Sequence, residues 1–209
     1  MDDATLTHQG VQSGQGSVLL IACGALSREI VALQRLNGWD HLTLRCLPAI
    51  LHNSPEKIPD EVRQAIRVGK AEGFEHIRVA YADCGTGGLL DTVCEAEGVP
   101  RIEGPHCYAF FDGLEAFAAR ADEEIGAFFL TDFLAKQFDA FVTQPLGLDR
   151  HPELRDMYFA HYDRLVYLAQ SDDAALTEAA RAAAVKLGLR FERRFTGFGA
   201  LEPFLAPQT

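Results

Sequence analysis

The sequence contains no apolar run long enough to cross a lipid bilayer, and basic side chains are scarce beside acidic ones. A membrane-spanning helix needs about 20 apolar residues, so we expect no membrane partner. The 19 lysines and arginines stand against 30 aspartates and glutamates, for a formal net charge of -11. Such a chain repels the phosphate backbone, and we expect no nucleic-acid partner. The first residues also lack the basic start and apolar core of a secretory signal, which favours a cytoplasmic protein.

Closely spaced cysteine pairs are missing as well. None of the five cysteines belongs to a C-x-x-C pair, the spacing that is typical of structural zinc fingers. An odd number of cysteines in a cytoplasmic chain also argues against a framework of disulfides. We therefore expect free thiols or thiolate ligands.

The composition is that of a globular protein, with 48% hydrophobic and 23% charged residues. Residues 1–16 are polar and show neither helical nor strand periodicity, so we expect a mobile segment there. The remainder, residues 17–209, is expected to form a single α/β domain.

Short apolar runs alternate with helical stripes along this domain. The strands are expected at residues 17–22, 41–46, 76–82, 99–102, 125–130, 164–169 and 190–195. The helices are expected from Ser27 to about 37, then at 59–73, 89–96, 107–117, 131–141, 152–161 and 172–186. This alternation predicts a Rossmann-like, three-layer α/β fold, with a mostly parallel sheet and helices on both faces.

Three cysteines follow predicted strands or open a helix. Cys23 lies in Ala-Cys-Gly-Ala after the first strand, Cys84 in Asp-Cys-Gly-Thr-Gly-Gly after the third, and Cys107 after a Gly-Pro-His turn. Ligands of open parallel sheets bind at the carboxyl ends of the strands, so these three thiols are expected to converge. Cys46 and Cys94 are expected to lie apart, as small buried side chains.

This set of thiols allows three functions. Three thiolates with one open position suit a zinc ion, our first choice, or an iron-sulfur cluster with one iron left free for substrate. Alternatively, Cys84 is the nucleophile of a metal-free enzyme, assisted as catalytic partner by His106 or by His52. The third alternative is a non-catalytic module that docks on another protein.

The glycine-rich turn after the third strand is a candidate for binding a small-molecule substrate. Its backbone could hold an anionic group at the start of a helix, although a turn required only for packing is an equal alternative. Neither a Walker lysine nor the G-x-G-x-x-G pattern is present, so we expect no nucleotide. His52 could bind substrate, ligate a metal or move a proton, or could simply be a hydrogen-bonded loop residue. The candidate substrate-binding residues are therefore His52, Gly85, Thr86, Gly87 and Gly88, while Tyr158, Tyr162 and Arg164 are expected to serve packing or solvation.

Five motifs in this order resemble the family known as domain of unknown function 1638. They span residues 21–30, 47–55, 81–88, 104–108 and 129–134. The resemblance extends from Ser17 to about Phe198, and members of that family tend to be encoded beside corrinoid proteins and their methyltransferases. This setting implies a role in one-carbon metabolism. Combined with the three thiols, it leads us to expect a metal-dependent transferase or an accessory protein of corrinoid-linked methyl transfer. The implied partner is a methyltransferase or a corrinoid protein.

Overall fold

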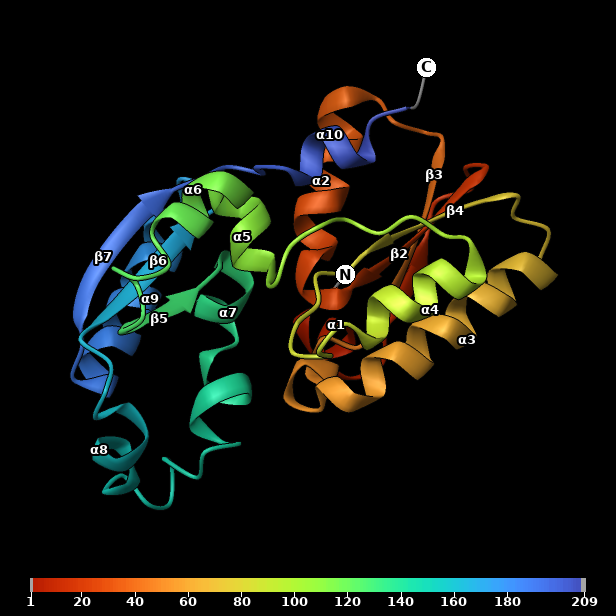
Figure 1. Cartoon of the computed structure of the whole chain (residues 1–209). Helices are drawn as coiled ribbons and strands as arrows, with labels where there is room; N and C mark the ends of the chain where they lie inside the picture. The colour runs from red at the N-terminus through yellow and green to blue at the C-terminus, as the bar shows by residue number, and fades with distance from the viewer. Residues whose placement is uncertain (1, 208–209) are drawn as a thin grey trace. The chain divides into compact units, whose positions relative to one another are not determined.

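The computed structural model describes residues 2–207, which belong to two compact units. The first unit comprises Met1–Phe110 together with Ala200–Thr209, and the second comprises Phe111–Gly199. Each unit is built on its own sheet (Figure 1). The sequence predicts one sheet, whereas the strands divide between two, one in each unit.

The sheet of the first unit has four strands in the order β1-β3-β2-β4. These are β1 (Val11–Ser13), β2 (Val18–Cys23), β3 (Leu42–Leu47) and β4 (His76–Ala80). The central strand β2 runs parallel to both β3 and β4, and β1 pairs antiparallel with β3. Residues Leu19 to Ala22 are fully buried, as expected for a parallel strand that is covered on both faces.

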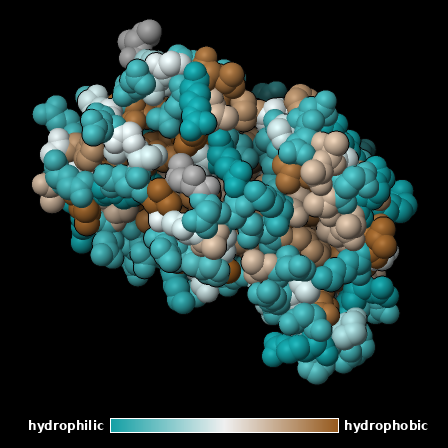
Figure 2. Space-filling model, turned by 180° about the vertical axis from the view of Figure 1, so that it is seen from behind, coloured by the Kyte–Doolittle hydropathy of each residue, from teal (hydrophilic) through white to brown (hydrophobic). Residues whose placement is uncertain are grey.

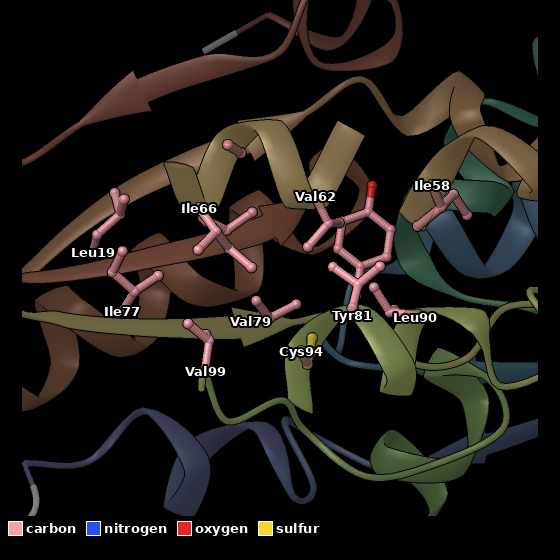
Figure 3. Packing of buried hydrophobic residues seen from close by; sticks show 13 residues of the cluster. Leu19, Ile58, Val62, Ile66, Ile77, Val79, Tyr81, Leu90, Cys94 and Val99 are labelled. Atoms are coloured by element: carbon pink, nitrogen blue, oxygen red, sulfur yellow. The ribbon is translucent and has the colours of Figure 1, made fainter. Parts of the chain in front are cut away.

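Helices cover both faces of this sheet. On one face, α3 (Ile58–Ala71) and α4 (Leu89–Glu97) pack on alternate strand residues such as Ile77 and Val79, which Figure 3 shows beside Val62 and Ile66. Between these two, Arg78 points to the opposite face because side chains alternate along a strand, and its Nη1 donates to Phe204 O at 2.7 Å. That face carries α2 (Ser27–Asn37) and α10 (Leu201–Leu205).

The N-terminal segment, where the sequence shows no periodicity, contains a short helix and the short strand β1. Helix α1 (Asp3–His8) begins at Asp2, whose carboxylate caps the backbone N–H of Ala4 and Thr5 at 3.0 and 3.1 Å. The helix contacts the turn at Gly24–Leu26, where a Cβ on Gly24 would collide with Leu6 O. Leu6 is fully buried, but a single apolar anchor is too little to produce a visible periodicity.

The second unit contains a three-stranded parallel sheet in the order β5-β6-β7. Its strands are β5 (Ala127–Leu130), β6 (Arg164–Ala169) and β7 (Arg190–Phe195). Helices α7 (Asp132–Lys136) and α9 (Ala174–Leu187) pack on one face. On the other face, Phe117 of α6 (Leu114–Ala119) contacts Phe129 at a ring distance of 5.7 Å. This unit also contains α8 (Leu154–Phe159) and a π-helical turn at Asp139–Thr143. Helix α5 (Cys107–Asp112) begins in the first unit and ends in the second.

The predicted α/β class, with parallel strands between layers of helices, is confirmed. The run at 99–102 forms no strand and makes only a single bridge between Val79 and Arg101. Pro100 accepts from Val79 N at 2.9 Å but has no N–H to extend the ladder. Within residues 2–207, no helix is both long and apolar enough to cross a membrane.

The packing of α1 can be tested with Leu6→Ala. Because Leu6 is fully buried, the truncation should lower the free energy of unfolding by about 2 to 4 kcal/mol, measured by urea denaturation. The control is Leu36→Ala on α2, where the side chain is 73% exposed and the change should stay within about 0.5 kcal/mol. Equal stability of the two variants would contradict the packing of α1 on the first unit.

Candidate thiol site

The carboxyl ends of β2 and β4 form the candidate site, which lies wholly within the first unit. Cys23 is the last residue of β2, and Tyr81 directly follows β4. Ala22 is paired with Ala80, so the next pair along the two strands is Cys23 and Tyr81. Both side chains contact the core beneath α3, on the same face of the sheet.

Cys23, Cys84 and Cys107 share one neighbourhood at this edge, because the pKa of Cys84 responds to Cys23 and that of Cys107 responds to both. Burial, followed by the charge of the neighbouring Cys23, raises the pKa of Cys84 to about 12. Burial also raises the pKa of Cys107, followed by the charges that Cys84 and Cys23 would carry as thiolates. Such effects require the sulfurs to be near neighbours in a poorly solvated place. All three thiols are therefore neutral at physiological pH in the metal-free protein.

Each of these sulfurs also accepts a hydrogen bond from a backbone N–H. Ala25 donates to Cys23, Cys107 donates to Cys84, and Tyr108 donates to Cys107. These contacts lower the thiol pKa values because they favour the thiolate, and they partly offset the effect of burial. The environment is thus built to accept negative charge on sulfur once a positive charge compensates it.

Two residues that the sequence patterns do not single out adjoin the thiols. Tyr81 is 2% exposed, and its hydroxyl makes no hydrogen bond of normal geometry with the residues that the structure describes. Figure 3 shows this hydroxyl on the side of the core formed by Ile58 and Val62. Burial, and then the adjacent Cys23, raise its pKa. Glu29, in the first turn of α2, is 5% exposed and contributes to the raised pKa of Cys23.

The loop that carries Cys84 is held by its own aspartate. Asp83 accepts hydrogen bonds from Thr86 Oγ1 at 2.6 Å, Gly88 N at 2.8 Å and Gly87 N at 3.1 Å. Burial of this carboxyl is outweighed by those bonds, and by one from Gly85, so its pKa is lowered. The donors at Gly85, Thr86, Gly87 and Gly88 that were expected to hold a substrate anion are therefore engaged by the chain itself, which favours the structural turn.

Cys84 has a backbone φ of +50°, the only positive value at a non-glycine residue in the described part of the chain. This left-handed conformation costs free energy for a residue with a Cβ and occurs mostly where the surroundings enforce it. Here Cys84 N donates to Pro105 O at 2.8 Å, and Asp83 N donates to Gly104 O at 3.0 Å. The two loops that carry Cys84 and Cys107 are thus fastened to each other.

The two candidate histidines lie at the surface beside these loops. His52 belongs to a short 3-10 helix, Ala49–Asn53, and His106 directly precedes Cys107. Desolvation of the ring lowers the pKa of His52, and the positive charge of a protonated His106 would lower it further. Desolvation also lowers the pKa of His106, although Asp83 opposes this. Both rings are mainly neutral at pH 7, the form that can accept a proton or bind a metal.

The remaining cysteines differ from each other. Cys46 is paired with Ala22 on the neighbouring strand, so its side chain points to the face of the sheet opposite that of Cys23. Burial, followed by the charge of Cys23, nevertheless raises the pKa of Cys46. Cys94 packs in the core beneath α3 and α4, and none of the other thiols affects its pKa, so it does lie apart.

No three or more His, Cys, Asp or Glu side chains among residues 2–207 are arranged to hold a metal ion as they stand.

Arg164 donates to Glu123 O at 2.6 Å and pairs with Asp163 at 3.2 Å. Tyr162 packs on Phe128 at a ring distance of 5.8 Å. Tyr162 and Arg164 thus serve packing and charge pairing in the second unit.

The role of Asp83 as the clamp of the Cys84 loop predicts a pH-dependent effect of Asp83→Asn. The folded-state pKa is depressed, so the stability contributed by the carboxylate is present above the unfolded value near 3.8 and disappears as pH falls through the folded value. We expect a loss of about 1 to 2 kcal/mol at pH 7 in urea denaturation, which should shrink towards pH 3. Asp60→Asn on the exposed surface of α3 is the control, and a loss that is equal at both pH values would contradict the clamp.

The comparisons with known proteins give one result. No curated protein and no solved structure matches this chain. The family model described as Protein of unknown function (DUF1638) matches residues 46–205, which is more than half of the chain and includes Cys84 and Cys107. The chain therefore belongs to the DUF1638 family.

Proposed function

We propose that the first unit binds a soft metal centre through the thiolates of Cys23, Cys84 and Cys107. The observation that supports this proposal is a set of three half-buried thiols, each with a backbone N–H donor, that influence one another's pKa at one sheet edge. A zinc ion is the first choice, and an iron-sulfur cluster with one open iron is the second.

The electrostatics of the cluster favour a metal over a set of inert thiols. Several thiolates cannot collect in a buried place without a cation, because each raises the pKa of the next. The N–H donors and the Tyr81 hydroxyl beside Cys23 would nevertheless stabilise negative charge on sulfur. A soft divalent cation supplies the missing positive charge and displaces the thiol protons.

Binding requires a closer arrangement than that of the metal-free protein. Zinc–sulfur bonds of about 2.3 Å place ligating sulfurs roughly 4 Å apart, whereas no such set of side chains is preformed among the described residues. Cys84 and Cys107 already approach each other through the N–H bond from Cys107, so Cys23 is the ligand that closes the site.

The chemistry of such a centre lies in its open position, where zinc would activate a bound thiol or water. Beside it, neutral His106 or His52 would be available to accept the released proton, and Asp83 holds the Cys84 loop in place. The resemblance stated above supports a place in corrinoid-linked methyl transfer, as a transferase of a small molecule or as an accessory to a methyltransferase or corrinoid protein.

A second candidate function is a metal-free enzyme with Cys84 as nucleophile. The positive φ of Cys84 favours it, because strained backbone is common at catalytic residues. The pKa of about 12 counts against it, since the attacking species is the thiolate. The balance favours the metal centre.

Replacement of single cysteines separates these functions. Cys84→Ser should lose most of the bound metal, by more than tenfold per chain, because a serine hydroxyl stays protonated and is a poor ligand of soft metals. Metal per chain is measured by elemental analysis of protein purified without oxygen, with an absorption spectrum to detect a cluster.

The matched control is Cys94→Ser, which replaces a buried thiol away from the cluster and should keep the metal of the wild type. Wild-type protein that contains no metal, or equal metal in wild type and Cys84→Ser, would reject the metal centre. Loss of activity in Cys84→Ser at unchanged metal content would favour the nucleophile instead.

A further inference from the structure

A second candidate site lies at the opposite edge of the same sheet. The face of the molecule in Figure 2 is mostly hydrophilic, and its hydrophobic residues form small separate groups, so no broad apolar surface stands out there. A pocket of about 500 Å³ opens instead at the amino ends of β2 and β4, within the first unit. Its lining includes Val18, His41, Phe74, His76, Arg78 and Val99.

Arg78 is the unusual residue of this pocket. It is 7% exposed, yet it forms no ion pair with any described carboxylate, and burial is the only influence that lowers its pKa. A buried charge without a counter-charge is costly, and in proteins such charges are nearly always paired. The guanidinium therefore requires either a negative ligand or another source of compensation.

The neighbouring helix compensates only part of the guanidinium. Arg78 Nη1 donates to Phe204 O at 2.7 Å and to Ala206 O at 3.1 Å, carbonyls at the end of α10. A cation at a helix C-terminus is favourable in its own right. These bonds also fix the guanidinium, but Nε and Nη2 have no acceptor among the described residues.

Those remaining donors are not sealed in the core. Arg78 is a buried residue, but its Nε and Nη2 are not themselves buried. Because Arg78 lines the pocket, these two donors face its open space. A fixed guanidinium with free donors on one side matches the geometry of a carboxylate or phosphate.

The acidic residues near the pocket do not supply the missing charge. Glu97 is bound by Lys70 Nζ and by Arg67 Nε, both at 2.9 Å, so its carboxylate is already neutralised. Glu75 lines the pocket from the exposed surface and does not pair with Arg78. Phe74, Val99 and other apolar residues form the walls, which suit a ligand with an apolar body.

We propose that this pocket binds a small organic anion, whose carboxylate or phosphate group is held by Arg78 and whose apolar body contacts Phe74 and Val99. The site is separate from the thiols and does not depend on a metal there. The opposing interpretation gives Arg78 one role, as the cation that caps α10, and leaves the pocket without a ligand.

Calorimetric titration of the full chain with benzoate, phenylphosphate and inorganic phosphate tests the proposal. We expect saturable binding at one site per chain for at least one of the two aromatic anions, and weaker binding of inorganic phosphate, which lacks the apolar body. Comparing the affinities for benzoate and phenylphosphate shows whether the site prefers a carboxylate or a phosphate group. Arg78→Lys should weaken binding of the preferred anion at least tenfold, because one ammonium cannot serve both α10 and the ligand.

Arg63→Lys is the control, the same substitution at a partly exposed arginine of α3 that pairs with Asp60, and it should bind like the wild type. If Arg78→Lys does not fold, backbone amide NMR shifts of the wild type take its place, and they should cluster at residues 74–78 and 97–99 on titration. Absence of saturable binding, unchanged binding in folded Arg78→Lys, or shifts confined to other residues would overturn the proposal.

Discussion

The parallel pairing of β2 with β4, in the register that matches Ala22 with Ala80, is the constraint on which the first unit depends. It sets Cys23 beside Tyr81 and starts the Cys84 loop at the same edge. A slip of one residue would turn Ile77 and Val79 away from α3 and bring Arg78 into the core. The same register thus determines the core, the thiol cluster and the orientation of the buried arginine.

The elements that could be predicted are those whose signal is local. The apolar runs at β2, β3 and β4 indicate buried strands, and the tendency of ligands to bind at the carboxyl edge of a parallel sheet is enough to group Cys23, Cys84 and Cys107. What could not be predicted depends on pairing between distant segments. The strand order β1-β3-β2-β4 and the division into two sheets have no local sequence signature.

The partners of Asp83 and Arg78 show what local sequence patterns leave out about a site. The glycines after Asp83 look like a nest for a foreign anion, but the aspartate that begins the motif takes their N–H groups. Arg78 lies within the predicted strand at 76–82, where no local pattern shows that α10 returns from the far end of the chain to accept its hydrogen bonds. In both cases the deciding partner is a charge or a carbonyl whose position only the folded chain reveals.

The contact of α1 with the turn after β2 also matters for how the protein is handled. Leu6 O approaches Gly24 so closely that no side chain fits between them, and Gly24 is the residue that follows Cys23. Deleting the first eight residues would uncover the backbone that positions one of the three sulfurs, and a folded partner fused directly onto them would crowd the same contact. Purification tags are therefore better placed behind a flexible spacer, and a shortened version of this chain is a poor substitute for the intact one in any work on its thiols.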